Sequence, residues 1–132
     1  MTNRSGLQSF AYAALRIVAG LLFACHGAQK LFGAWGAHKP EMWSQLWFGG
    51  IIELVCGILV AIGLFTRPAA LLASGTMAVA YFQFNWKLVM DNNMFLPIVN
   101  KGESAVLYCF VFFMFALSGA GAYSLDARRG RM

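Results

Sequence analysis

Residues 48–65 read FGGIIELVCGILVAIGLF, a run whose only charged side chain is Glu53. A helix rises about 1.5 Å per residue, so about 20 residues of this kind cross the hydrocarbon core of a bilayer. Apolar runs of the same kind cover residues 12–32, 69–86 and 104–122. The sequence therefore predicts an all-α membrane protein in which four transmembrane helices form a bundle.

The composition supports a lipid environment. Of the 132 residues, 60% are apolar and 11% are charged, whereas a soluble domain carries roughly 25% charged residues. The four spans leave no room for a second domain, so we expect one membrane domain over residues 1–132 with the lipid bilayer as its partner. The net charge of +5 orients the spans in such a chain, and no nucleic-acid partner is expected.

The basic residues divide between the two predicted sides of the membrane. One side holds only arginines, and the other holds lysines together with acidic residues: Arg4, Arg67, Arg128, Arg129 and Arg131, against Lys30, Lys39, Lys87 and Lys101 with Glu41, Asp91 and Glu103. By the positive-inside rule, both termini are predicted to be cytoplasmic (N-in/C-in) in a bacterial inner membrane. The four tryptophans, Trp35, Trp43, Trp47 and Trp86, then form one outer interfacial layer.

The connections carry weaker signals. Residues 41–48 follow Pro40 with apolar side chains at helical spacing, which predicts a short interfacial helix in the first outer loop. The second outer loop, residues 87–102, is expected to fold back over the bundle. Between the second and third spans, Thr66 is expected to cap a helix that begins near Pro68.

Ionisable groups inside spans are costly and mark candidate sites. His26 and Glu53 are predicted to lie about 9 Å and about 8 Å below the outer helix ends, with Lys30 one turn above His26. Glu53 should therefore face the bundle interior and reach the first helix through His26, Gln29 or Lys30. Two interpretations stay open: a pair that only docks two helices, or a pocket that handles a proton or a polar ligand.

Arg16 is the fourth ionisable residue within a predicted span, beside His26, Lys30 and Glu53. Arg16 is expected to extend its guanidinium to lipid headgroups at the inner surface. Small residues at Gly20, Ala24 and Ala28, and at 118–121, predict close helix packing.

The cysteines, Cys25, Cys56 and Cys109, occur without a CxxC or HxxxH motif, so no metal site is predicted. The chain also lacks a phosphate-binding glycine loop, a nucleophile elbow and a haem-attachment motif. The sequence thus predicts no intrinsic cofactor, and catalytic residues are unknown.

Six short motifs, in this order, resemble the DoxX-like family of small four-helix membrane proteins: LRIVAG (15–20), HGAQKLFG (26–33), ELVCG (53–57), GLFTR (63–67), NKGES (100–104) and GAYSLD (121–126). The resemblance runs from about Leu15 to Asp126. It implies a candidate site whose polar positions are Arg16, His26, Lys30, Glu53 and Arg67. The chain departs from the family pattern at Lys101, where that pattern has glycine.

The resemblance implies a non-catalytic subunit of a larger redox or respiratory complex, which anchors a partner or forms a quinone-adjacent surface, with a quinone as the candidate ligand. Two alternatives stay open. One is a standalone membrane oxidoreductase or carrier that binds a quinone or another small hydrophobic molecule, and the other is a purely structural packing subunit.

Overall fold

A computed structural model of the chain describes residues 5–87, 93–94 and 96–130. Three charged residues used in the sequence-based topology, Arg4, Asp91 and Arg131, lie outside these ranges, as does part of the second outer loop (88–92 and 95).

The described part of the chain is helical and has no strand. Its long helices are α1 (Gly6–Phe32), α2 (Gln45–Ile62), α3 (Thr66–Ala80) and α5 (Glu103–Ser118). A π-helical segment, η2 (Tyr81–Trp86), continues α3, and three short elements, η1 (Ala34–Gly36), α4 (Pro97–Asn100) and α6 (Leu125–Arg128), lie in the connections.

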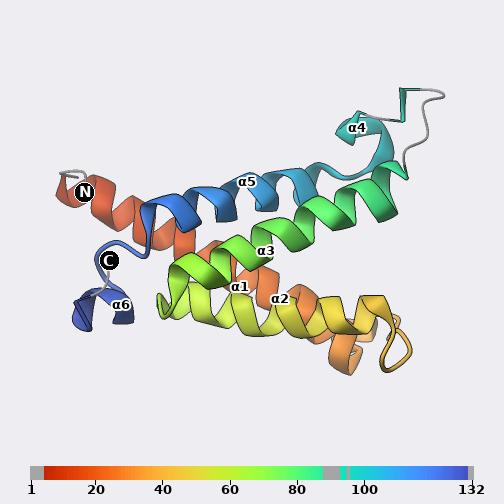
Figure 1. Cartoon of the computed structure of the whole chain (residues 1–132), viewed down its shortest axis with the longest axis horizontal. Helices are drawn as coiled ribbons and strands as arrows, with labels where there is room; N and C mark the ends of the chain where they lie inside the picture. The colour runs from red at the N-terminus through yellow and green to blue at the C-terminus, as the bar shows by residue number, and fades with distance from the viewer. Residues whose placement is uncertain (1–4, 88–92, 95, 131–132) are drawn as a thin grey trace.

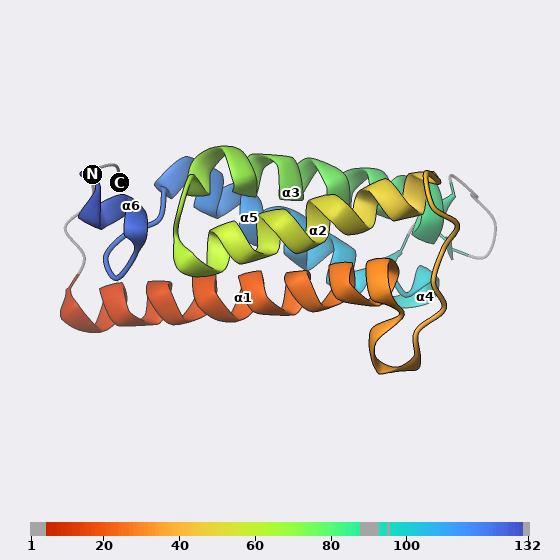
Figure 2. The ribbon, with the colours of Figure 1, turned by 90° about the horizontal axis from the view of Figure 1, so that it is seen from below.

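The long helices form two pairs, α1 with α2 and α3 with α5 (Figures 1 and 2). One end of the molecule holds the start of α1, the α2–α3 turn and α6. The opposite end holds η1, the start of α2, η2 and α4, and there the two pairs diverge in Figure 1. The segments that carry the four tryptophans, namely η1, residues 43–47 around the start of α2, and η2, thus lie at the same end of the bundle.

The α1–α2 pair is packed backbone against backbone through glycines. A Cβ atom on Gly20 would lie 2.6 Å from the Gly57 carbonyl oxygen, and one on Gly27 would lie 2.7 Å from the Gly50 carbonyl oxygen. The predicted small-residue packing is therefore present on α1, although the second close contact is made by Gly27, whereas Ala28 is only partly buried.

Helices α1 and α2 are long and apolar enough to span a membrane, whereas α5 is apolar but shorter. The outward faces are also apolar, with exposed Leu21 and Leu22 on α1, Leu71 on α3, and Leu107 and Phe110 on α5. The buried core lies between the pairs and centres on Phe23, Val60, Ala70, Phe112 and Phe115.

Helix α1 begins six residues before the predicted span because Ser5 and Gln8 form a reciprocal capping box. The predicted interfacial helix at 41–48 is wrong. Trp43 has a left-handed backbone (φ +74°), which breaks the helical path, and the Ser44 hydroxyl accepts from Trp47 N–H, so residues 45–48 are the first turn of α2.

The fourth span is predicted over residues 104–122. Helix α5 stops at Ser118, and residues 119–124 are not helical. Gly119 (φ +82°) and Gly121 (φ +74°) adopt positive φ values that an α-helix excludes. The small-residue patch at 118–121 therefore forms an unwound segment at the end of α5 rather than a helix-packing face.

Candidate functional site

The predicted partner of Glu53 on the first helix is Lys30. Lys30 Nζ lies 2.5 Å from Glu53 Oε2, and the pair joins α1 to α2 near the diverging end of the bundle. Glu53 is 1% exposed, whereas the Lys30 side chain is 30% exposed. The carboxylate thus lies in the interior, and the ammonium group reaches it from the rim.

Only one carboxylate oxygen of Glu53 is paired. Among the described residues, Glu53 Oε1 is buried and accepts no hydrogen bond. A buried carboxylate oxygen without a donor is unfavourable, because the protein has replaced none of the hydrogen bonds that water would supply. The hydrogen-bonding capacity of the Glu53 carboxylate is therefore only partly satisfied by the described residues.

Glu53 lines a partly open cavity of about 210 Å³ between the two helix pairs. The polar side chains around this cavity come from four different elements: His26 and Lys30 of α1, Glu53 of α2, Asn85 of η2, and Ser104 and Tyr108 of α5. The rest of the wall is apolar and includes Phe23, Met77 and Phe84. A cavity of this size holds a single substituted ring, since about 150 Å³ is enough for benzene.

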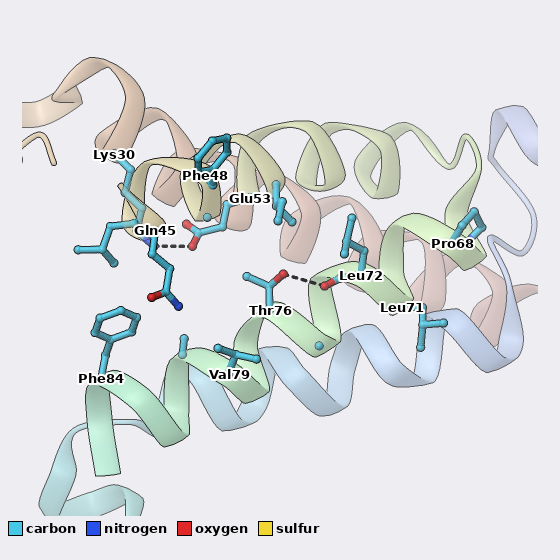
Figure 3. Close-up of a pocket in the computed structure, with 15 residues that line it drawn as sticks. Lys30, Gln45, Phe48, Glu53, Pro68, Leu71, Leu72, Thr76, Val79 and Phe84 are labelled. Carbon is cyan, nitrogen blue, oxygen red and sulfur yellow. Dashed lines mark hydrogen bonds and ion pairs between the residues drawn. The ribbon is translucent and has the colours of Figure 1, made fainter. Parts of the chain in front are cut away.

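A groove of about 640 Å³ runs along the α2–α3 side of the molecule (Figure 3). Its walls are mostly apolar, with Phe48, Leu71, Leu72, Val79 and Phe84 among them. The groove and the cavity share five lining residues, namely Lys30, Leu46, Glu53, Ala80 and Phe84. The ion pair therefore lies where a long apolar groove meets a small polar cavity.

His26 lines the same cavity, and its ring packs edge-on against Tyr108, with ring centroids 5.9 Å apart. Tyr108 in turn stacks with Phe112 of the core. The structure thus brings together three of the candidate residues, His26, Lys30 and Glu53.

Arg16 lies elsewhere and does not extend to headgroups. It is 1% exposed, and its guanidinium donates to five backbone carbonyls at 2.8–3.5 Å: Val60, Ala61, Ala120, Ala122 and Tyr123. The first two carbonyls belong to the last turn of α2, and the others belong to the unwound segment after α5. Backbone carbonyls at a helix end carry partial negative charge and lack intrahelical donors. They therefore bind the Arg16 guanidinium in place of the lipid headgroups.

Arg67 also binds a helix end. Its Nη1 donates to Ala116 O at 3.2 Å and to Leu117 O at 2.6 Å, so it caps α5 from an exposed position. The two arginines of the candidate site therefore fix helix termini at the end of the bundle opposite α4 (Figure 1), and they are separate from the Lys30–Glu53 cavity.

The predicted cap at Thr66 is replaced by Asp126. The Asp126 carboxylate accepts from Phe65 N–H at 3.0 Å and from Thr66 N–H at 2.9 Å, at the N-terminus of α3. The Thr66 hydroxyl is buried and has no hydrogen-bond partner among the described residues. An anionic side chain suits the positive end of a helix better than a hydroxyl.

In the part of the chain that the structure describes, no group of histidine, cysteine or acidic residues is arranged to hold a metal ion. Cys25 is exposed, Cys56 is buried and Cys109 lies in α5, where its carbonyl accepts from the Ser74 hydroxyl at 2.8 Å.

Sequence reasoning missed Asn85, Ser104 and Tyr108 as cavity residues. Each is a polar residue in or beside an apolar run, which was the available signal. Their convergence depends on how η2 and α5 pack against the α1–α2 pair, and no local pattern records that packing.

These features describe a small helical protein whose two longest helices are apolar enough to span a membrane, with a small cavity that shares lining residues with an apolar groove. The chain belongs to the DoxX family, whose family model matches residues 11–86, from α1 to η2. It is 41% identical to an uncharacterized protein of Haemophilus influenzae, over 96% of each chain. No solved structure matches it.

Proposed function

We propose that the chain is a four-span subunit of a membrane redox complex that receives a quinone-type molecule between its two helix pairs and carries no redox centre of its own. The single observation that carries the proposal is the buried Glu53 carboxylate, which is paired through one oxygen only and belongs to a residue that lines both the small cavity and the apolar groove. Ligand sites combine apolar walls with a few convergent polar groups in this way.

The chemistry of the lining matches both parts of such a molecule. The aliphatic and aromatic wall of the groove suits an apolar tail that arrives laterally from the lipid. The ammonium group of Lys30 can donate to a ring carbonyl, and the carboxylate of Glu53 can accept from a ring hydroxyl. The pair therefore offers a partner to either redox state of a quinone head.

A purely structural role is the second candidate, because the Lys30–Glu53 pair joins two helices that already pack closely. Breaking a buried ion pair destabilises a fold even where no ligand binds. The two candidates predict different results for a substitution at Glu53. A ligand site predicts loss of ligand from a chain that stays stable, whereas a structural role predicts loss of stability.

We expect Glu53→Gln to reduce the quinone that co-purifies with the chain by about tenfold, since one charged acceptor hydrogen bond contributes about 1.5–3 kcal/mol. The measurement is quinone content after organic extraction of protein solubilised in mild detergent, with the co-purifying chains identified by mass spectrometry. Glu41→Gln, which changes an exposed acidic residue of the first loop, is the matched control and should retain full quinone content.

The outcomes separate the candidates. Loss of quinone from a chain that keeps its thermal midpoint and its redox partners supports the proposal. A wild-type chain that carries no quinone and no cofactor-bearing partner, combined with a lower midpoint in Glu53→Gln, supports the structural role.

We also expect both termini to be cytoplasmic, with all 132 residues in one membrane domain. The support is that the start of α1 and α6 lie at the same end of the bundle (Figure 2), where Arg67, Arg128 and Arg129 also gather. An alkaline phosphatase fused after Met132 should be inactive, and a fluorescent protein that folds only in the cytoplasm should be bright. The reverse pattern would contradict the orientation.

A further inference from the structure

We propose that the end of the bundle that holds α6 binds an anionic phospholipid, whose phosphate group is held by Arg128. The proposal is separate from the proposed function, because α6 lies at the end of the bundle opposite the Lys30–Glu53 pair (Figure 1). It starts from a surface depression of about 590 Å³ between the end of α2 and α6, which is lined by Ile62, Tyr123, Ser124, Leu125, Ala127 and Arg128.

Helix α6 is fixed to the turn between α2 and α3. Asp126 N–H donates to Gly63 O at 2.8 Å, and the Asp126 carboxylate accepts from the N–H groups of residues 65 and 66. The Ser124 hydroxyl caps the first turn of α6 by accepting from Ala127 N–H. The backbone that carries Arg128 is therefore held in place before any ligand binds, which lowers the entropic cost of binding.

The exposed charges around this depression are all positive. Asp126 is 6% exposed, and both of its carboxylate oxygens accept hydrogen bonds at the start of α3. Among the described residues, no other acidic side chain lies in α6, in the α2–α3 turn or in the last turns of α2 and α5. Arg67, Arg128 and Arg129 are exposed there. The surface therefore complements an anion.

The arginines differ in how far they are already engaged. Arg67 donates to two carbonyls of α5, and the Arg129 guanidinium lies 4.8 Å from the centroid of the Phe65 ring. The Arg128 side chain makes no hydrogen bond, ion pair or ring contact with the rest of the described chain. Its planar guanidinium can donate to two oxygens of one phosphate group, which an ammonium group cannot match.

The apolar part of the lining selects a lipid over a soluble anion. Ile62 is 42% exposed, Tyr123 is 66% exposed and Leu125 is 38% exposed, and all three share the depression with Arg128. Ile62 is the last residue of α2, which is long and apolar enough to span a membrane. In a bilayer its end lies beside the headgroups, where the phosphate meets Arg128 and the acyl chains meet the apolar side chains.

Two lipids with the same acyl chains test the proposal: dioleoyl-phosphatidylglycerol, which is anionic, and dioleoyl-phosphatidylcholine, which is zwitterionic. Binding is measured by native mass spectrometry of the purified full chain, or of the complex with which it purifies. We expect the anionic lipid to bind about fivefold or more tightly. Arg128→Gln should remove most of this preference. Lys39→Gln, which removes the same charge from an exposed loop at the other end, is the matched control and should keep the preference.

Tyr123→Asn tests the apolar contact. Asparagine tolerates the left-handed backbone of this position (φ +59°), so the variant removes the ring without new strain. It should weaken phosphatidylglycerol by about threefold, and inorganic phosphate should not displace the lipid from the native chain. Displacement by phosphate, with no effect of Tyr123→Asn, would show a site for a soluble anion only and overturn the proposal.

Equal affinity of the native chain for the two lipids, or equal losses in Arg128→Gln and Lys39→Gln, would also overturn it. The quinone content of Arg128→Gln should match that of the native chain, so the result for the lipid leaves the proposed function standing or failing on its own experiment.

Discussion

Replacing Arg16 with methionine is expected to lower the free energy of unfolding by about 3 kcal/mol or more, the larger of the effects expected for the polar residues. The substitution keeps much of the side-chain volume but removes the Arg16 donor from five carbonyl groups of two chain segments, of which, within the described chain, Val60 O alone keeps a second donor, Gly63 N–H. Buried acceptors that lose their partner cost about 1–3 kcal/mol each before any relaxation. Thermal unfolding in detergent, followed by circular dichroism, should show the midpoint falling by about 10 °C.

Arg67→Gln is the matched control, because Arg67 also binds helix-end carbonyls but from an exposed position. Water can replace its hydrogen bonds, so the change should cost less than about 1 kcal/mol. Arg16→Lys should fall between the two variants, since an ammonium group keeps the charge but cannot match the planar fork of the guanidinium. Equal midpoints for Arg16→Met and the native chain would contradict the structural assignment of Arg16.

The Arg16 contacts also show where sequence reasoning stops. Arg16 stood out as a charge within an apolar run, and that much was visible from the sequence. Its partners follow it by 44 to 107 positions in the chain. The favourable surroundings for its charge arise only when the end of α2 meets the unwound segment after α5, so the local pattern favoured a route to the headgroups instead.

The helices were more accessible to prediction than their ends. Length and apolarity located α1, α2, α3 and α5, because the 3.6-residue repeat and the cost of exposing backbone to lipid leave few other structures. The ends depend on single interactions. Asp126, which lies sixty positions from Thr66, supplies the cap of α3, and the positive φ values of Gly119 and Gly121 stop α5 before the predicted position.

The Lys30–Glu53 pair was predictable because depth alone restricts its members. A carboxylate well inside a span can be paired only by a polar group at the same level of a neighbouring helix, and Lys30 was one of three such groups. The cavity around the pair was not predictable in the same way. Asn85 and Tyr108 approach Glu53 from the other helix pair, whose placement follows from side-chain packing along the whole bundle.

The two ends of the bundle therefore differ in how the helices are held together. Arg16, Arg67 and Asp126 connect helix termini through hydrogen bonds at the end that holds α6. At the other end the two pairs diverge around the cavity and the groove. Stability should consequently depend mostly on the first end and on the α1–α2 contact.

Gly27→Ile is expected to destabilise the chain by about 3 kcal/mol or more. A Cβ atom on Gly27 would overlap the backbone amide nitrogen of Leu54 and lie 2.7 Å from the Gly50 carbonyl oxygen, and real Cβ atoms do not approach backbone so closely. The contact involves main chain on both sides, so no change of rotamer can relieve it. The two helices must separate, which would also draw Lys30 away from Glu53 one turn further along the pair.

Gly75→Ile is the matched control, because the same side chain on α3 meets nothing within 4 Å. It should change the unfolding free energy by less than about 1 kcal/mol, with a small gain from the better helix propensity of isoleucine. Gly27→Ala should lie between them, since a single methyl group needs a smaller displacement of α2. If Gly27→Ile and Gly75→Ile unfold at the same temperature in detergent, the close backbone contact between α1 and α2 is refuted.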